Sequence, residues 1–216
     1  MIKLNIKLIG KELNVDSKFD EIQQKIEIDF KNLDLLKNVF IHRSYLNENA
    51  GQKLNSNERL EFLGDAVLEL VVTEYMYLKY KEPEGILTNW RSALVRGQNL
   101  AKIAEKFALG EYLFLSKGEE KSGGRTRELL LANTFEALIG AIYLEKGYEV
   151  TKNFLLKNLI YQLPEIISKK LHLDPKTTLQ ELIQEKLNIT PTYEVLKSEG
   201  PDHAKIFEVG VLLMRK

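Results

Sequence analysis

Acidic side chains interrupt two strongly apolar segments of this chain, and their types and spacing could support chemistry. In "NERLEFLGDAVLEL", from Asn57 to Leu70, residues Glu58, Glu61 and Asp65 lie at positions i, i+3 and i+7. This spacing places all three on one face of a helix whose other residues are largely apolar. Because like charges on one helix face repel each other, the pattern indicates that an opposite charge offsets them.

The second such segment is "LLLANTFEALIGAIYL", which places Asn133 and Glu136 at i and i+3 of another apolar helix. If the two helices pack face to face, carboxylate and amide oxygens meet, and these are the ligands that Mg²⁺ prefers. A divalent cation would neutralise the repulsion between Glu61 and Asp65 and act as a Lewis acid at a phosphodiester. The residues therefore predict a metal-dependent site for phosphodiester chemistry.

Two other interpretations of the acidic residues are weaker. A single Glu on a helix usually marks only a solvated surface, but here acids interrupt apolar segments twice. A di-iron carboxylate bundle requires Glu-x-x-His pairs, and none of His42, His172 or His203 follows a Glu at that spacing.

Helical periodicity extends over about the first 168 residues and changes character near Ser168–Thr177. We expect an N-terminal extension over 1–16, a helical domain over 17–168, a linker over 169–175 and an α–β–β fragment over 176–216. The fold class expected is all-α, followed by this partial α–β–β module. Predicted helices are Ser17–Ile26, Leu33–Tyr45, a long one from Asn57 to about Lys81, Leu87–Arg96, Asn99–Phe107, Thr126–Lys146, Glu149–Tyr161 and Thr178–Leu187; predicted strands are Thr192–Glu199 and Ile206–Met214.

Capping residues define some of the expected helix ends. Asp16 or Ser17 is a plausible N-cap for the first helix, and the Asn57 side chain for the longest one. Gly147 is expected to end the helix that carries Asn133 and Glu136.

Composition places the chain among soluble globular proteins. It has 216 residues, 44% hydrophobic and 29% charged, and no cysteine, which excludes disulfides, thiolate metal sites and cysteine nucleophiles. No apolar run approaches the roughly 18 residues of a membrane span. The lysine-containing N-terminus alternates like a strand and does not resemble a signal peptide, so we expect a cytoplasmic protein without a membrane partner. The 31 basic and 31 acidic residues balance, which argues only weakly against a nucleic-acid partner.

Four motifs in order carry a resemblance to a known family. They are "HRSY" at His42–Tyr45, "NERLEFLGDAVL" at Asn57–Leu68, "LVRGQNLA" at Leu94–Ala101, and "GEEKSGGRTRELLLANTFEALIGAIYL" at Gly118–Leu144. This series resembles bacterial ribonuclease III, the double-stranded RNA endonuclease, over about Ser17 to Ser168. The resemblance implies Mg²⁺-dependent hydrolysis of both strands, with Mn²⁺ able to substitute and no small-molecule cofactor. It also implies 5′-phosphate products with short 3′ overhangs, a role in rRNA and mRNA processing, and a homodimer.

The resemblance also assigns roles to residues. Glu61, Asp65 and Glu136 match the catalytic metal ligands, and Glu58 matches an acidic position beside them. At the dimer, Phe62 matches an aromatic knob that enters a socket on the partner, although an ordinary core residue is the alternative. Glu84, which we group with Phe62 at the dimer, matches an acidic residue that helps shape the cleavage valley.

Asn133 departs from the family pattern, which usually has Asp at this position. An amide oxygen can ligate Mg²⁺, but the site then has one negative charge fewer. We therefore expect a metal set of Glu61, Asp65, Asn133 and Glu136 with weakened affinity for the ion.

RNA-binding residues are expected in both parts of the chain. The Gly-rich loop Lys117–Arg127 offers Lys121, Arg125 and Arg127 before a helix start, a setting that suits phosphate oxygens. The weaker candidates in the helical domain are Arg96, Gln98, His42 and Arg43. The C-terminal fragment resembles the first part of a double-stranded RNA-binding domain, in which Gln180, Glu181, Gln184 and the hairpin loop Pro201–His203 would reach minor grooves.

The C-terminal fragment is expected to be incomplete, because the third strand and second helix of that domain do not follow. Its apolar strand face would lack a covering layer, so we expect a poorly ordered or partner-stabilised tail and weakened RNA affinity. The leading interpretation of the whole chain is a Mg²⁺-dependent endoribonuclease. The alternatives are a dimer that binds duplex RNA without cutting it, because Asn133 weakens the site, and a structural protein that only dimerises within an RNA-processing assembly.

Overall fold

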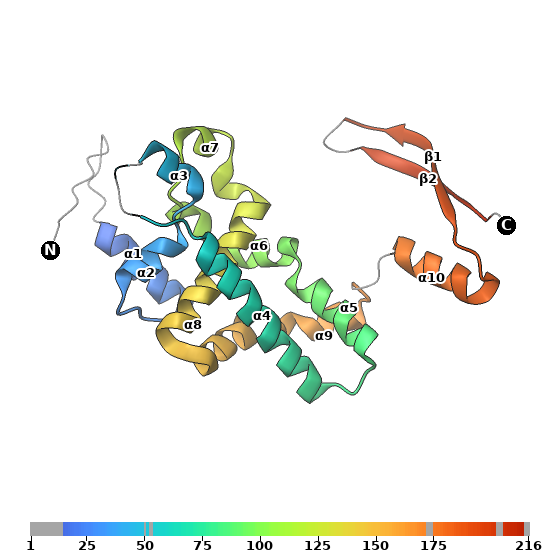
Figure 1. Cartoon of the computed structure of the whole chain (residues 1–216), viewed down its shortest axis with the longest axis horizontal. Helices are drawn as coiled ribbons and strands as arrows, with labels where there is room; N and C mark the ends of the chain where they lie inside the picture. The colour runs from blue at the N-terminus through green and yellow to red at the C-terminus, as the bar shows by residue number, and fades with distance from the viewer. Residues whose placement is uncertain (1–14, 50, 52–53, 172–174, 202–204, 214–216) are drawn as a thin grey trace. The chain divides into compact units, whose positions relative to one another are not determined.

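The structure is a computed structural model that describes residues 15–49, 51, 54–171, 175–201 and 205–213. The chain divides into a unit that extends to Ile167 and a unit that begins at Ser168. The first unit is helical throughout apart from short connections (Figure 1). Its α-helices are α1 (Val15–Ile26), α2 (Leu33–Val39), α3 (Arg43–Glu48), α4 (Glu58–Lys79), α5 (Glu84–Val95), α6 (Gly97–Lys106), α7 (Lys117–Lys121), α8 (Glu128–Asn158) and α9 (Leu163–Ser168).

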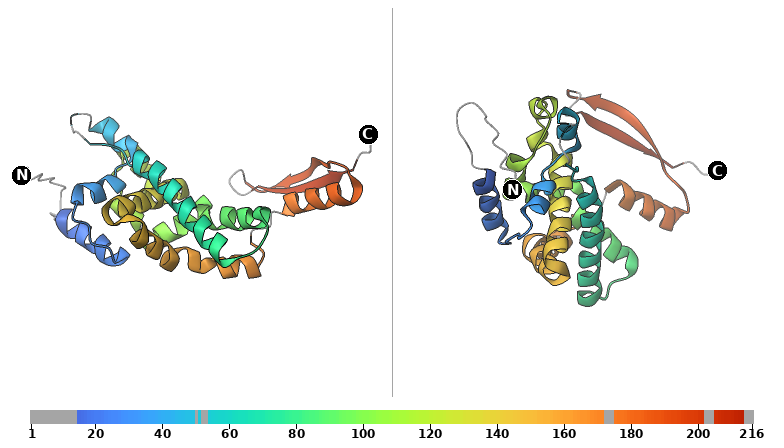
Figure 2. Two further views of the ribbon diagram at one scale, coloured as in Figure 1. Left: turned by 60° about the horizontal axis from the view of Figure 1, so that its bottom comes forward. Right: turned by 60° about the vertical axis from the view of Figure 1, so that its left-hand side comes forward.

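Helix α8 forms the centre of this unit, with α4 and α6 packed against it (Figures 1 and 2). Its interior is mainly apolar: Phe135, Leu138 and Ile142 of α8 have no exposed surface, and neither has Val71 of α4 or Leu100 of α6. Because α8 is buried on several sides, it carries apolar residues around most of its circumference. A polar residue on a buried face of α8 is therefore an exception among its neighbours.

The predicted helix Leu33–Tyr45 is wrong, because α2 and α3 are separate helices. Between them, Phe114 pairs with the chain as a strand would: its N–H donates to the Phe40 carbonyl at 2.8 Å, and the His42 N–H donates to the Phe114 carbonyl at 3.2 Å. An isolated parallel bridge joins Ile41 to Phe114. Because these backbone groups are hydrogen-bonded to the distant residue Phe114, they cannot form the hydrogen bonds that would continue the helix.

The prediction that the Asn57 side chain caps α4 is also wrong. Asn57 is buried and helical in its dihedral angles, and its side-chain amide donates to the Val39 carbonyl at 3.0 Å. The predicted start of the first helix is wrong as well, since α1 begins at Val15 and contains both Asp16 and Ser17. The break at Gly147 is confirmed: α8 consists of two helical segments joined at a kink, where Gly147 has the non-helical angles φ +76° and ψ −176°.

The C-terminal unit consists of α10 (Pro175–Leu187) followed by an antiparallel hairpin of β1 (Thr192–Glu199) and β2 (Ile206–Leu212). The register pairs Thr192 with Leu212 and Glu199 with Ile206, with an irregularity between Val195 and Lys197. Both predicted strands are therefore present. Large apolar side chains of the hairpin are exposed, among them Leu196 and Ile206. The predicted disorder of this tail and its weak RNA affinity stay predictions.

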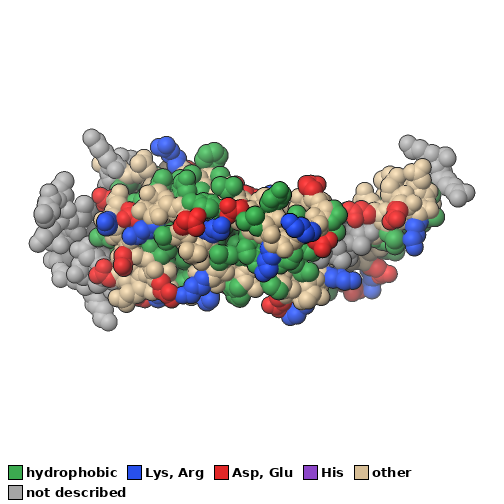
Figure 3. All heavy atoms as spheres, turned by 90° about the horizontal axis from the view of Figure 1, so that it is seen from below, with side chains coloured by type: hydrophobic (Ala, Val, Ile, Leu, Met, Phe, Trp, Pro, Cys, Tyr) green, Lys and Arg blue, Asp and Glu red, His purple; other side chains and the backbone are tan. Residues whose placement is uncertain are grey.

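Charges of both signs are distributed over the surface. Figure 3, seen from below, shows Lys and Arg side chains interspersed with Asp and Glu, with hydrophobic side chains between them. This mixture corresponds to the formal net charge of zero for the whole chain. A charged functional site in this protein must therefore come from a local cluster of like charges.

Candidate active site and nucleic-acid interface

Helices α4 and α8 touch backbone to backbone, and this contact positions the acidic residues. A Cβ placed on Gly64 would lie 1.8 Å from the Glu136 carbonyl oxygen, and one on Gly140 would lie 2.3 Å from the Leu60 carbonyl oxygen. Only glycine permits so close an approach. The contact sets Glu61 and Asp65 of α4 against the α8 face that carries Asn133 and Glu136.

The pKa shifts show that the charges of these side chains interact. Burial, together with the nearby charges of Asp65 and Glu61, raises the pKa of Glu136 to about 7. Burial also raises the pKa of Glu61, with Glu58 and then Asp65 adding to the shift, while a polar interaction with the Asn133 side chain lowers it. Several carboxyl groups are thus concentrated at a partly buried place, and their negative charges raise one another's pKa at Glu61 and Glu136.

Glu58 lies at the edge of this acidic cluster and has its own partners. It is exposed, accepts a hydrogen bond from Ser56 Oγ at 2.8 Å, and pairs with Arg43 at 3.7 Å. It is also close enough to raise the pKa of Glu61. Glu58 therefore borders the cluster formed by the other acids but faces solvent.

The donor set suits a hard divalent cation, because it offers three carboxylates and one amide oxygen with uncompensated negative charge. In the part of the chain that the structure describes, however, no three His, Cys, Asp or Glu side chains converge closely enough to hold a metal ion. The predicted ligands are neighbours on facing helices without a preformed coordination sphere. Their role as metal ligands stays a prediction.

Phe62, predicted as a dimer residue, points out of the core. Its side chain is 80% exposed, which rules out the alternative of an ordinary core residue. It belongs to a stripe on α4 at helical spacing, and this dimer stripe consists of the exposed residues Phe62, Ala66, Leu70, Thr73 and Tyr77. An exposed and mostly apolar stripe of this kind is typical of an interaction surface.

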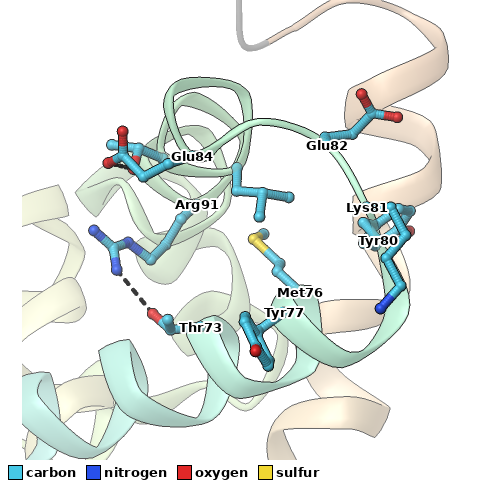
Figure 4. Close-up of a pocket in the computed structure, with 10 residues that line it drawn as sticks. Thr73, Met76, Tyr77, Tyr80, Lys81, Glu82, Glu84 and Arg91 are labelled. Carbon is cyan, nitrogen blue, oxygen red and sulfur yellow. Dashed lines mark hydrogen bonds between the residues drawn. The ribbon is translucent and has the colours of Figure 1, made fainter.

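A pocket of about 620 Å³ lies at the far end of the same stripe, between α4 and α5 (Figure 4). Met76, Tyr77, Tyr80 and Leu87 supply most of its apolar lining. Glu84, the other residue predicted at the dimer, stands at its rim and accepts a hydrogen bond from Thr88 Oγ1 at 3.0 Å.

An ion pair crosses the two helices beside the pocket. Arg91 of α5 pairs with Glu69 at 2.9 Å and donates to Thr73 Oγ1 at 2.8 Å. These contacts hold α5 against α4, and Arg91 and Thr73 both line the pocket.

The predicted RNA-binding loop Lys117–Arg127 folds into α7 and a 3₁₀ turn, and its arginines are engaged within the protein. Arg125 pairs with Glu120 at 2.8 Å and donates to the carbonyls of Gly110 and Leu113. Arg127 pairs with Glu119 and donates to Ser122 Oγ at 2.9 Å. Both arginines therefore stabilise the loop, whereas Lys121 is exposed at its surface.

The remaining RNA-binding candidates belong to both units of the chain. Arg96 and Gln98 are exposed at the junction of α5 and α6. On α10, Gln180 and Glu181 are exposed, while Gln184 is hydrogen-bonded to Asn188 and Thr190 near the helix end. Pro201 is exposed, and His203 lies outside the described residues.

Comparison with known proteins decides the family. The family model described as Ribonuclease-III-like matches residues 32–163, and the model described as a double-stranded RNA binding motif matches residues 175–215. This chain belongs to the ribonuclease III family. It is therefore an endoribonuclease of the ribonuclease III type with a motif for binding double-stranded RNA.

Individual relatives agree with this assignment. The chain is 48% identical to a ribonuclease 3 of Nitratiruptor sp. over 195 residues, covering 90% of this chain and 84% of that protein. It is 45% identical to a ribonuclease 3 of Enterococcus faecalis, covering 89% and 84%. The nuclease domain of a Campylobacter jejuni ribonuclease III, described with a region involved in dimer formation, superposes with a TM-score of 0.62 at 40% identity, covering 68% of this chain and 99% of that one.

Some residues of this ribonuclease III site were not found from the sequence. The pocket residues Met76, Tyr77 and Tyr80 form the run "YMYLKY" with their neighbours, and its density of aromatic residues on an exposed helix was a usable signal. Ser44 and Glu48 of α3 hydrogen-bond to the backbone of the 116–117 segment, and no sequence pattern indicates such contacts. Among the described residues, no helix is both long and apolar enough to cross a membrane.

Proposed function

We propose that this ribonuclease III family member uses Mg²⁺ to hydrolyse both strands of duplex RNA, leaving 5′-phosphates and short 3′ overhangs. The observation that carries this proposal is the meeting of Glu61 and Asp65 with Asn133 and Glu136 where α4 and α8 touch at Gly64 and Gly140. By the family resemblance, the substrates would include rRNA and mRNA precursors, and Mn²⁺ would replace Mg²⁺.

Each side chain has a distinct role in the proposed site. When bound, Mg²⁺ would supply Lewis acidity at the phosphodiester and lower the pKa of water. Glu61, Asp65, Asn133 and Glu136 would hold the ion through oxygen atoms. The pKa of Glu136 is raised by burial first and by the charges of Asp65 and Glu61 second, and the ion would balance those charges. Glu58, at the solvent edge, would help define the side from which the substrate enters.

We further propose a homodimer in which two copies of the dimer stripe pack antiparallel about a two-fold axis. In such an isologous interface each surface meets its own copy. Phe62 lies eight residues before Leu70, and Leu78 lies eight after it, so an axis at Leu70 places Phe62 opposite the other end of α4. That end forms the pocket of Met76, Tyr77 and Tyr80, so each Phe62 would fill the pocket of the partner subunit.

One assay tests the catalytic proposal. Labelled duplex RNA is incubated with the protein in Mg²⁺, in Mn²⁺ and in EDTA, with a single-stranded RNA of the same sequence as control. We expect short duplex products only with a metal ion, and degradation of these products by an exonuclease that requires a 5′-phosphate. Binding of the duplex without cleavage in either metal would support the alternative of a non-cleaving dimer with a site weakened by Asn133.

A further inference from the structure

The short helix α3 contacts both parts of the proposed RNA site. It lies between the start of α4, which carries the acids, and the loop Lys117–Arg127. On the loop side, two of its side chains hold consecutive backbone amides. The Ser116 N–H donates to Ser44 Oγ at 3.1 Å, and the Lys117 N–H donates to both carboxylate oxygens of Glu48 at 3.2 Å.

These contacts act on the first residues of α7. Ser116 is the N-cap of that helix, and its own hydroxyl accepts from the Glu119 N–H at 3.1 Å. Glu119 in turn pairs with Arg127 at the end of the loop. A displacement at Ser116 would therefore be transmitted along the whole loop.

On the other side, α3 is fixed to the acidic helix. Arg43, its first residue, pairs with Glu58 at 3.7 Å. The backbone just before α3 holds the start of α4, since the Asn57 N–H donates to the Ile41 carbonyl at 2.8 Å. The same segment pairs with Phe114, three residues before Lys117. Residues 41–48 thus contact the start of the acidic helix α4 on one side and the beginning of the loop Lys117–Arg127 on the other.

His42 completes this arrangement. Its Nδ1 accepts from the Ser44 N–H at 3.3 Å and lies 2.8 Å from Ser44 Oγ. A ring nitrogen that accepts carries no proton, so the Ser44 hydroxyl donates to His42 and keeps its lone pairs for the Ser116 N–H. Burial lowers the pKa of His42, and the positive charges of Arg43 and Arg127 lower it further. The negative charges of Glu119 and Glu58 act in the opposite direction. The lowered pKa agrees with a neutral ring.

We propose that α3 sets the position of the loop Lys117–Arg127 relative to the acidic site, and that Ser44 and Glu48 are positioning residues for duplex RNA. The inference rests on the proposed function, because it requires the loop to contact the RNA. Neither residue would touch the scissile phosphate. Their loss would displace a phosphate-binding loop and leave the acids of α4 and α8 in place.

The test compares KM with kcat for a labelled duplex in saturating Mg²⁺. Ser44→Ala and Glu48→Ala remove the acceptors, whereas Ser44→Thr and Glu48→Gln retain an oxygen at each position. Asn47→Ala, an exposed residue of the same helix, is the matched control. We expect KM to rise roughly threefold to tenfold in the two alanine variants, with kcat within about twofold of wild type. The conservative variants and the control should stay within about twofold of wild type in both constants.

A double-mutant cycle with Lys121→Ala tests whether Ser44 acts through the loop. If it does, removing Lys121 should raise KM less in the Ser44→Ala background than in the wild type. Should Ser44→Ala fail to fold, Glu48→Ala and Glu48→Gln are measured with Lys121→Ala in its place.

The inference is overturned if the alanine variants leave KM unchanged, if they lower only kcat, or if their effects add fully to that of Lys121→Ala. Each of these results leaves the proposed function intact as long as the wild type cleaves duplex RNA. A wild type that neither binds nor cleaves the duplex overturns the proposed function and this inference together.

Discussion

Asn133 is the one neutral member of the four oxygen-donating side chains at the contact of α4 and α8. Its polar interaction with Glu61 lowers the pKa of that carboxyl, so it supports the charged form of Glu61 without adding charge itself. An aspartate in its place would add a negative charge beside two carboxyls whose pKa values are already raised. At this residue, metal affinity and the stability of the metal-free protein are therefore opposed.

Asn133→Asp tests this opposition. The added carboxylate should lower the Mg²⁺ concentration for half-maximal cleavage about fivefold to tenfold, because hard cations favour carboxylate over amide oxygen. It should also lower the melting temperature in EDTA, through repulsion with Glu61 and Glu136. The measurements are a Mg²⁺ titration of the initial cleavage rate and thermal unfolding. An unchanged Mg²⁺ dependence would show that Asn133 does not limit the metal site.

Glu136→Gln should stabilise the metal-free protein while abolishing cleavage. The pKa of Glu136 is about 7 in the folded chain and about 4.5 in the unfolded one. The folded state thus holds the proton more tightly, and the free energy of unfolding falls as pH rises from about 4.5 to about 7. Glutamine cannot ionise, so the free energy of unfolding of the variant does not fall in this way. At pH 8 the variant should be more stable than the wild type by about 1–2 kcal/mol after allowing for solvent screening.

The measurement for Glu136→Gln is chemical unfolding in EDTA at pH 8 and pH 5. The advantage of the variant should be largest at pH 8 and mostly absent at pH 5. Glu105→Gln, at an exposed position of α6, serves as control and should show little dependence on pH. An equal change at both pH values would mean that Glu136 does not carry the electrostatic penalty.

At the scale of elements, the contact between α4 and α8 determines where every acidic side chain lies. Gly64 and Gly140 let the two backbones meet, and Glu61, Asp65 and Glu136 lie within about one turn of the glycine on their own helix. Helix interiors normally disfavour glycine by about 1 kcal/mol relative to alanine. Here the close packing and the site it creates offset that disadvantage.

Gly64→Ala should destabilise the protein by at least about 3 kcal/mol, because its Cβ would lie 1.8 Å from a backbone oxygen that cannot rotate away. The helices would have to separate, so any folded fraction should also lose cleavage. Gly85→Ala in α5 is the matched control, since nothing lies within 4 Å of its Cβ. It should be neutral or stabilising by up to about 1 kcal/mol in chemical unfolding. Equal stability of the two variants would contradict the observed packing of α4 on α8.

At the scale of the whole molecule, the dimer stripe is an exposed and mostly apolar surface that a single protomer leaves uncovered. Phe62 is 80% exposed at one end of α4 and the apolar pocket lies at the other, with Leu70, 57% exposed, between them. An exposed phenylalanine on a protomer is costly in water, at about 1.5–3 kcal/mol for a side chain of this size. Burial in a second copy would recover this free energy twice in each dimer.

Phe62→Ala should therefore weaken the dimer by roughly 2 kcal/mol or more for each of the two symmetric contacts, as expected for a central aromatic anchor. Leu70→Asp, at the proposed two-fold axis, should weaken it further by placing two carboxylates together. Sedimentation velocity over a range of concentrations measures both effects. Leu144→Ala is the control, because Leu144 is exposed on α8 outside the stripe. Wild-type dimerisation of the Phe62→Ala variant would exclude the proposed packing.

Much of the helical architecture could be predicted, because it follows from local periodicity. The long helix with Glu58, Glu61 and Asp65, the kink at Gly147 and the two strands of the hairpin all follow from spacing and from glycine. The errors lie where distant parts of the chain meet. Phe114 divides a predicted helix into α2 and α3, and Val39 occupies the side chain of Asn57 that was expected to cap α4.

The sequence by itself determined the family and the residue types of the acidic site, since both depend on the order and spacing of side chains along single helices. Tertiary structure alone decided which charges remain available. Arg125 and Arg127 are as basic in the sequence as Lys121, yet both are paired within their loop. It also decided that Ser44 and Glu48 hold the amides of residues 116–117, about seventy positions along the chain. Such pairings depend on the packing of distant segments, which local patterns do not encode.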